Sequence, residues 1–268
     1  PRIVGDFVWA GMDYLGEVGV GSWVPKDHCD GIMDGSCGWM TAGSGRVDFI
    51  GDETCEALYT KVALEKTPIE IGVVPHKYLK MKHSVSSWKM SMALHSWSFE
   101  GEEEKTCRVE VYSIGETVQL FLNQKKIKQA KTKKNGRNIF KVKYQPGELK
   151  AVSLDSDGNK LGEVILKSAS KENALTIKPE SNEISKDELA FVRLSFTDTN
   201  GEIKPLNEGE IKVEIKGGKL ISFGSANPYC KEGYHNDTSK TNYGVTMAVI
   251  KPNGDSNIVI KASGLGLE

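Results

Sequence analysis

The chain has 268 residues, 38% of them hydrophobic and 26% charged, with a formal net charge of −1. This composition is that of an ordinary soluble globular protein, and the length allows two domains, or a domain remnant with two small domains. No apolar run reaches the roughly 20 residues of a membrane span, and the near-zero charge excludes a global basic field for nucleic acid or anionic lipid, so we expect any binding partner to be neutral.

Cysteine usage favours a reducing, cytoplasmic environment. The five cysteines are an odd count without close pairs or zinc-like spacing: Cys29, Cys37, Cys55, Cys107 and Cys230. We therefore expect free thiols. His28 beside Cys29, with Cys37 further on, offers a weak alternative as a metal site, but paired ligands at the usual spacing are missing, so we predict no metal and no cofactor.

The stretch GDFVWAGMDYLGE, from Gly5 to Glu17, contains the residues that most resemble a binding site. An apolar run that includes Trp9 precedes a polar turn that carries Asp13 and lies between two glycines. This pattern predicts a short buried strand followed by an irregular loop, which can direct an aromatic face and carboxylates into a cleft. The pattern alone favours the alternative, an ordinary core strand with a polar turn.

FVWAGMDYLGE resembles the segment that closes the catalytic (β/α)8 barrel in glycoside hydrolase family 2, the family of β-galactosidases and β-glucuronidases. The resemblance implies that Trp9 ends the last barrel strand and lines the floor of the sugar site. An indole packs well on the C–H face of a pyranose, whose hydroxyl groups seek polar partners at the rim. Asp13 is the expected partner of one hydroxyl group, and Glu17 is a weaker candidate.

The family retains anomeric configuration, which requires two carboxyl groups about 5 Å apart. The resemblance implies that both are glutamates on earlier barrel strands, so we expect no catalytic residue in this chain and no hydrolysis by it alone. Asn-Glu pairs, the usual context of the acid/base, occur at Asn182-Glu183 and Asn207-Glu208. Both lie in loop-like surroundings far beyond the barrel segment, and we interpret them as coincidence.

Residues 20–50 are rich in glycine and contain Trp23 and Trp39, which predicts a long ordered loop. These tryptophans either stack on sugar or anchor the loop. GSGRVDFIG resembles the family segment before the last barrel helix, and helical spacing of apolar residues predicts that helix over 52–66, ended by Pro68. IEIGVVPHKY resembles the exit from the barrel. We place the first boundary near Pro75, so that residues 1–75 are a barrel remnant whose unpaired edges would be apolar.

Residues 76–168 are predicted to form an immunoglobulin-like β-sandwich. Val109 and Val111 alternate with polar residues, and apolar and polar residues also alternate over much of 117–122. The two runs lie on either side of a turn at Gly115. The words HSW, VEVYS, VQLFLN and YQPGELKAV resemble the domain that follows the barrel in many family members. The lysines between Lys125 and Lys143 allow a nucleic-acid hypothesis, but alternation with apolar residues favours a solvated strand face.

Residues 169–268 are predicted to form a second immunoglobulin-like β-sandwich after a polar linker at 168–175. The alternating run at 191–197 is followed by an Asn-Gly turn, and the run at 211–215 by a Gly-Gly turn. KGGKLISFGSANP is similar to the bacterial immunoglobulin-like domain at the C-terminus of some family β-galactosidases. Tyr234, in the loop 226–243, either binds sugar or packs locally, and we favour local packing.

The predicted fold class is therefore mainly β: two immunoglobulin-like β-sandwiches preceded by the last strand, loop and helix of a (β/α)8 barrel. The predicted function is the C-terminal part of a retaining β-glycosidase that hydrolyses terminal β-galactosides or related glycosides. Its expected partners are a β-linked oligosaccharide and the rest of the barrel. We expect it to bind neither nucleic acid nor membrane, and the sequence does not decide whether it forms an oligomer. The alternatives are a noncatalytic carbohydrate-binding module that uses Trp23, Trp39 or Tyr234, or a structural tandem sandwich without ligand.

Overall fold

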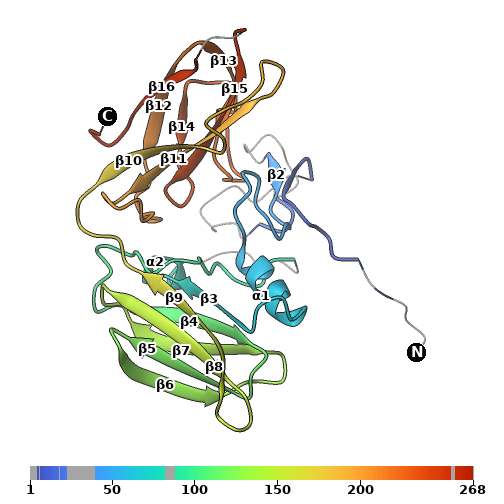
Figure 1. Cartoon of the computed structure of the whole chain (residues 1–268), viewed down its shortest axis with the longest axis vertical. Helices are drawn as coiled ribbons and strands as arrows, with labels where there is room; N and C mark the ends of the chain where they lie inside the picture. Colours follow the sequence, from blue (N-terminus) through green and yellow to red (C-terminus); the bar gives the residue numbers. More distant parts are fainter. Residues whose placement is uncertain are drawn as a thin grey trace.

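The computed structural model describes residues 5, 7–17, 19–22, 40–81, 88–254 and 257–267. It is mainly β, as predicted, and consists of antiparallel sheets stacked as two sandwiches along the long axis (Figure 1). The N-terminal segment, residues 7–66 within the described ranges, lies beside the junction of the two sandwiches (Figure 1). No helix in the described ranges is long and apolar enough to cross a membrane.

The first sandwich packs a three-stranded sheet, β3-β4-β7, against a four-stranded sheet, β6-β5-β8-β9. The seven strands are β3 (Ile69–Val74), β4 (Thr106–Ser113), β5 (Thr117–Leu122), β6 (Lys125–Lys131), β7 (Arg137–Lys143), β8 (Glu148–Leu154) and β9 (Lys160–Lys167). Trp97, Phe99 and Tyr144 are buried in its core and contact one another edge to face or at a tilt. The exposed Lys141 and Lys143 alternate with buried residues in β7, which matches a solvated strand face.

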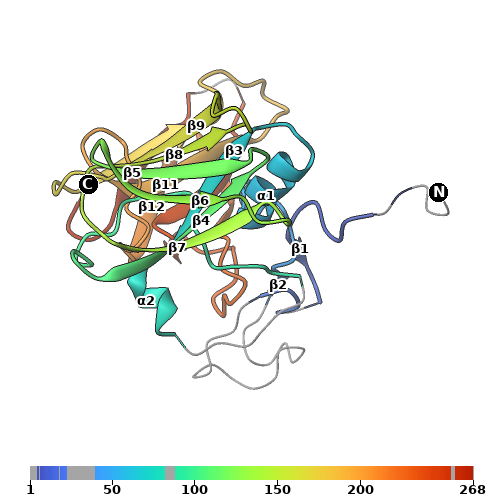
Figure 2. The same ribbon diagram turned by 90° about the horizontal axis from the view of Figure 1, so that it is seen from below.

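Strand β4 has the predicted alternation on its inner face, but its outer face is also covered. Val109 and Val111 are buried in the core as expected. Glu110, which points the other way, is fully buried as well. Helix α1 (Cys55–Ala63) contacts β3 and β4, and the two views place it beside this sheet (Figures 1 and 2). A sheet face that the alternation pattern assigns to solvent is therefore an interface with the N-terminal segment.

Strand β3 corrects one interpretation from the sequence. We expected IEIGVVPHKY to leave the barrel, but Ile69–Val74 pairs antiparallel with β4 along its whole length. Ile69, Ile71 and Val73 enter the first core because alternate residues of a paired strand face the same side. The division at residues 75 and 168 stays a prediction, and this pairing favours a first boundary before Ile69.

The second sandwich packs the sheet β10-β11-β15-β13 against the sheet β14-β12-β16. Its strands are β10 (Ala174–Pro179), β11 (Ala190–Thr197), β12 (Glu210–Lys216), β13 (Gly218–Gly224), β14 (Thr238–Lys240), β15 (Val245–Pro252) and β16 (Val259–Ser263). Val192, Leu194 and Phe196 enter the core from β11, in the predicted register. Tyr234 packs against Phe49 of the N-terminal segment, with ring centroids 5.5 Å apart, so this ring forms a contact between two parts of the molecule.

The N-terminal segment contains little regular structure. A two-stranded sheet pairs β1 (Tyr14–Leu15) with β2 (Thr41–Ala42), and α1 begins three residues later than the predicted start at residue 52. The helix starts late because the Asp48 carboxylate accepts hydrogen bonds from the backbone N–H groups of Ile50 and Asp52, which fixes a turn there. A second short helix, α2 (His76–Leu79), follows β3.

Several predictions fall on residues outside the described ranges. They concern the loop tryptophans Trp23 and Trp39 and the weak metal alternative at His28, Cys29 and Cys37. Within the described ranges, Cys55, Cys107 and Cys230 are free thiols.

Candidate functional site

Trp9 lies on the exposed part of the N-terminal segment. Its side chain is 62% exposed and Phe7 is 99% exposed, so the predicted buried strand is instead a solvent-facing run. The Trp9 Nε1–H donates to the Tyr14 hydroxyl at 3.0 Å, and this hydroxyl donates to the Glu17 carboxylate. That hydrogen bond raises the pKa of Tyr14. The structure thus groups Trp9 with Tyr14 and Glu17, and Tyr14 was not among the site residues predicted from the motif.

Asp13 lies on the opposite side of the chain from Tyr14, because neighbouring residues in extended backbone point to opposite faces. Its exposed fraction is 7%, and its Oδ1 accepts the backbone N–H of Gly45 at 2.6 Å. Burial raises the pKa of Asp13, although Lys89 and the Gly45 hydrogen bond oppose the shift. Asp13 therefore joins the β1–β2 region to the loop before α1, and it does not share the surroundings of Trp9.

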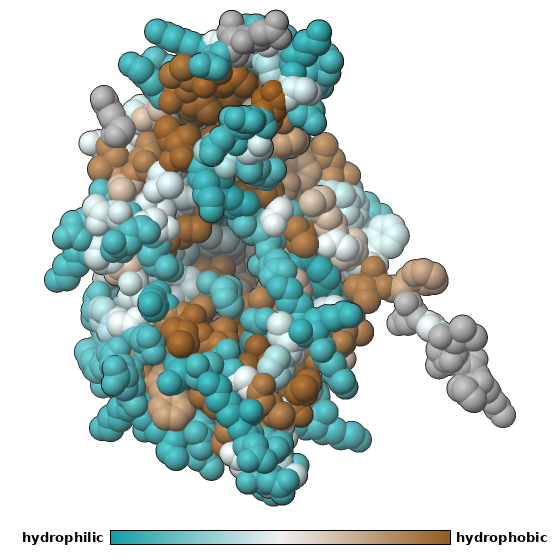
Figure 3. Space-filling view, viewed as in Figure 1, coloured by the Kyte–Doolittle hydropathy of each residue, from teal (hydrophilic) through white to brown (hydrophobic). Residues whose placement is uncertain are grey.

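Asp13 lines a cavity of about 880 Å³ at the junction of all three parts of the molecule, here called the junction cavity. The N-terminal segment contributes Asp13 and Asp48, the first sandwich contributes Lys89 and His95, and the second sandwich contributes Tyr243. Trp9 is not among the lining residues. The surface is visibly hollowed between the two sandwiches (Figure 3).

Contacts between the parts hold the walls of the junction cavity together. Arg193 of β11 donates to the Asp52 carboxylate at 2.6 Å and to the Ile50 carbonyl at 3.2 Å. The backbone N–H of Met40 donates to the Pro228 carbonyl at 2.8 Å. Because side-chain and backbone bonds both cross this boundary, the second sandwich has a defined position against the N-terminal segment.

Lys89 balances part of the acidic lining. Burial disfavours its charge, but Glu56, Tyr243 and Asp13 more than offset this effect, so the pKa of Lys89 lies above its ordinary value. Glu56 is largely occupied, since it accepts the N–H groups of Met90 at 2.5 Å and Ser91 at 3.3 Å. Lys89 is therefore a charged counter-ion within the cavity wall.

Asp48 is the most strongly shifted carboxyl group of the lining. Burial raises its pKa to about 6, against the opposing backbone hydrogen bonds, and the charges of Asp52 and Asp13 add to the rise. Within the described ranges, no group of three or more His, Cys, Asp or Glu side chains has the arrangement of a metal site. The lining groups can accept hydrogen bonds from a ligand, and Asp48 can exchange a proton near neutral pH.

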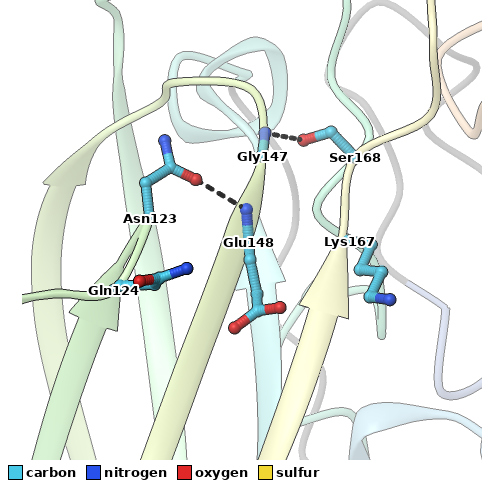
Figure 4. Close-up of a pocket in the computed structure, with 6 residues that line it drawn as sticks. All are labelled: Asn123, Gln124, Gly147, Glu148, Lys167 and Ser168. Carbon is cyan, nitrogen blue, oxygen red and sulfur yellow. Dashed lines mark hydrogen bonds between the residues drawn. The ribbon is translucent and has the colours of Figure 1, made fainter.

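A shallow depression at one end of the first sandwich, about 360 Å³ in volume, is a weaker candidate (Figure 4). Asn123 and Ser168 already have protein partners, because Asn123 Oδ1 accepts the N–H of Glu148 at 2.8 Å and Ser168 Oγ accepts the N–H of Gly147 at 3.1 Å (Figure 4). Asn123 also donates to the Pro146 carbonyl. These contacts fix the end of β8, and we assign the depression a structural role.

Comparison with known proteins agrees with this architecture. A model for "Glycoside hydrolase family 2 C-terminal domain 5" matches residues 174–268, and one for "Domain of unknown function (DUF4982)" matches residues 104–162. Beta-galactosidase BoGH2A from Bacteroides ovatus is 23% identical over 258 residues, which cover 94% of this chain and 26% of that protein.

Solved structures extend the likeness to the whole chain. A glycosyl hydrolase family 2 member from Bacteroides cellulosilyticus is 26% identical with a TM-score of 0.82, covering 99% of this chain and 35% of that one. A beta-glycosidase from Bacteroides vulgatus shares the fold, at 18% identity and a TM-score of 0.68, over 97% of this chain and 29% of that one. The chain thus spans about a quarter to a third of these relatives, and the matches identify it as similar to the C-terminal region of glycoside hydrolase family 2 proteins.

Proposed function

We propose that this chain is the C-terminal part of a retaining β-glycosidase that hydrolyses terminal β-galactosides or related glycosides. The observation that carries the proposal is the continuous match over 99% of the chain to a family 2 glycosyl hydrolase, together with the weaker match to a named β-galactosidase. Both sandwiches and the N-terminal segment fall within these matches.

In this proposal the exposed run around Trp9 packs against the other strands of the catalytic barrel in the intact enzyme. Phe7, Trp9, Met12 and Leu15 are each more than half exposed, although such residues are normally buried. Packing by the rest of the catalytic barrel would cover the apolar run and leave the indole face of Trp9 for a sugar ring. The Tyr14 hydroxyl, bonded to both Trp9 and Glu17, would hold the indole in position.

The bond-breaking chemistry is assigned to two glutamates on other strands of the barrel, outside this chain. Asp13 holds the loop before α1 through its bond to Gly45. It can accept a hydrogen bond from a sugar hydroxyl group only if the sugar enters the junction cavity, which Asp13 lines. The sandwiches hold the barrel end in position: α1 packs on β3 and β4, and Arg193 bonds to the Ile50–Asp52 turn.

Two assays test this function. The purified chain is expected to release no nitrophenol from nitrophenyl β-galactoside above the buffer rate. In the longer protein that carries this segment, Trp9→Ala is expected to lower kcat/KM by roughly 10- to 100-fold, because a stacking surface is lost from the transition state.

Leu189→Ala, a similarly apolar substitution at an exposed residue of the second sandwich, is the control and should leave kcat/KM unchanged. Turnover by the purified chain would contradict the assignment of the catalytic residues elsewhere. Wild-type kcat/KM in Trp9→Ala would contradict the role of the indole.

A further inference from the structure

The junction cavity has the size and construction of a ligand site. Its volume of about 880 Å³ lies within the roughly 300–1,000 Å³ typical of small-molecule sites. Such sites occur preferentially between domains, where walls from different elements converge. The Arg193–Asp52 and Met40–Pro228 bonds fix two of those walls before any ligand enters.

One wall is an aromatic residue held in an unusual backbone conformation. Tyr243 occupies the first central position of the two-residue turn from Asn242 to Val245, closed by backbone hydrogen bonds of 3.0 and 3.1 Å. Its φ of 51° is in the left-handed region, where such turns normally place Asn, Asp or Gly. The turn alone therefore does not explain a tyrosine here. The ring packs edge to face on Tyr78 of α2, with centroids 6.0 Å apart, and it also lines the cavity.

Polar groups accompany the Tyr243 ring in the lining, and they include the side chains of Ser91 and Ser96. Asn227 and Asn242 add amide groups to the lining. Hydroxyl, amide and carboxylate groups beside a tyrosine ring match the mixed polar and apolar faces of a saccharide.

The charges of the lining select among saccharides. Among the described residues, seven carboxyl groups line the cavity: Asp13, Asp48, Asp52, Glu53, Glu56, Glu70 and Glu202. Arg193 pairs with Asp52 and Lys61 pairs with Glu53, and Lys89 offsets part of the charge of the other five. A cavity with excess negative charge repels anionic ligands and tolerates neutral ones.

We propose that the junction cavity binds an uncharged saccharide unit, with Tyr243 of the second sandwich as a contact residue, and discriminates against uronic acids. The saccharide class rests on the proposed function, while the preference for a neutral ligand rests on the lining charges. In this arrangement the second sandwich contributes directly to ligand choice.

The test is an NMR titration of the isotope-labelled chain with methyl β-galactopyranoside and methyl β-galacturonide, which differ only by oxidation at C6. Saturable shifts are expected for the amides of Ala226, Asn227 and Tyr229 and of residues 242–245 with the galactoside. The galacturonide should bind at least about tenfold more weakly at low salt, with the difference shrinking as salt rises.

Tyr243→Asn removes the ring but keeps a residue that tolerates a positive φ, and it should weaken galactoside binding about fivefold or more. Leu265→Asn is the matched control, because Leu265 has the same φ of 51° in a turn closed by the same pair of backbone bonds. It should bind like the wild type.

Four results would overturn the proposal: absence of saturable shifts at these amides, equal affinity for the galacturonide, unchanged binding in Tyr243→Asn, or shifts confined to the Trp9 indole and abolished by Trp9→Ala. Cavity binding by the chain, together with a longer protein that hydrolyses no β-glycoside, would refute the proposed function and keep the site. Hydrolysis by the longer protein without cavity binding would do the reverse.

Discussion

The first sandwich and the N-terminal segment differ in how far they bury their large apolar side chains. In the sandwich, Trp97 and Phe99 are completely buried. In the segment, Phe7 and Trp9 face solvent, and the order of the residues around them comes from backbone hydrogen bonds and the buried carboxylate of Asp13. The sandwich therefore buries its apolar side chains in its own core. The exposed run of the segment has the composition of a buried interface, but the described residues provide no surface that covers it.

Breaking the sandwich side of this comparison should have the largest effect. Glu110 is fully buried and accepts bonds from Arg137 Nη2 at 2.8 Å, Arg108 Nε at 3.0 Å and Ser91 Oγ at 2.7 Å. Glu110→Ala leaves two arginines without their carboxylate, and we expect a loss of about 3–5 kcal/mol in the free energy of unfolding, measured with urea. Glu104→Ala, on an exposed glutamate of the same sandwich, should change it little. Similar unfolding midpoints for the two variants would contradict the structural role of the Glu110 cluster.

Breaking the segment side should have a smaller and more local effect. A Cβ at Gly45 would lie 2.2 Å from the backbone N of Asp13 and 2.4 Å from the Val47 carbonyl oxygen. Gly45→Ala must therefore move the loop before α1 away from the backbone at Asp13. We expect a local loss of roughly 2–3 kcal/mol, seen as faster amide exchange around Asp13 while β4 keeps its protection. Gly11→Ala, where a Cβ meets open space, is the control. Faster exchange in β4 as well would show that the segment and sandwich unfold together.

These two sites also mark the limits of the sequence as a guide to the fold. The alternation of Val109 and Val111 predicts β4 and its inner face, because strand periodicity is local. The same pattern assigns Glu110 to solvent, since nothing local reveals that α1 covers the outer face. The segment IEIGVVPHKY resembles a barrel exit, and no local pattern shows that Ile69–Val74 pairs with β4, which begins more than 30 residues later.

The candidate site divides in the same way. The motif around Trp9 identified Trp9 and Asp13 together, but the structure places them in different surroundings: Trp9 is exposed and bonds to Tyr14, whereas Asp13 is buried against the backbone of Gly45. The junction cavity combines residues from all three parts of the chain, so no spacing in the sequence marks it. One signal was available: a tyrosine before glycine in the turn Asn242 to Val245, where a residue tolerant of positive φ is expected.

The junction between the sandwiches permits a smaller test, on how they are held together. Lys204 is almost completely buried, and its Nζ donates to Glu100 at 3.0 Å, the Lys171 carbonyl at 3.1 Å and Asn173 at 2.8 Å. Lys204→Met keeps the length of the side chain but removes these bonds, with an expected loss of about 1–2 kcal/mol and a larger radius of gyration by X-ray scattering. Lys77→Met breaks the exposed pair with Glu208 across the same junction, which should cost under about 0.5 kcal/mol. An unchanged radius in Lys204→Met would show that other contacts set the angle.

The smallest expected effect has the opposite sign, and it contrasts Asp48 with Glu110. Glu110 is paired with arginines, whereas Asp48 lies near Asp52 and Asp13, and burial raises its pKa to about 6 from an ordinary 3.8. The folded state therefore keeps this proton to higher pH than the unfolded state, so stability falls as the pH rises between about 4 and 6. Asp48→Asn retains an acceptor for Ile50 and Asp52 without the charge. It should raise the free energy of unfolding by about 1–2 kcal/mol at pH 7 and change it little at pH 4.

Asp155 provides the matched control, because its carboxylate accepts backbone bonds from residues two and four positions on, as that of Asp48 does. Both turns continue with glycine at a positive φ, Gly51 and Gly158. Asp155 is exposed, and its bonds to Asn159 lower its pKa instead. Asp155→Asn should thus destabilise the fold at pH 7 and lose that effect in acid, as judged from urea unfolding across the pH range. If both variants shift stability in the same direction at pH 7, turn chemistry alone sets the behaviour of Asp48; opposite directions would show that the acidic surroundings of the junction cavity set it.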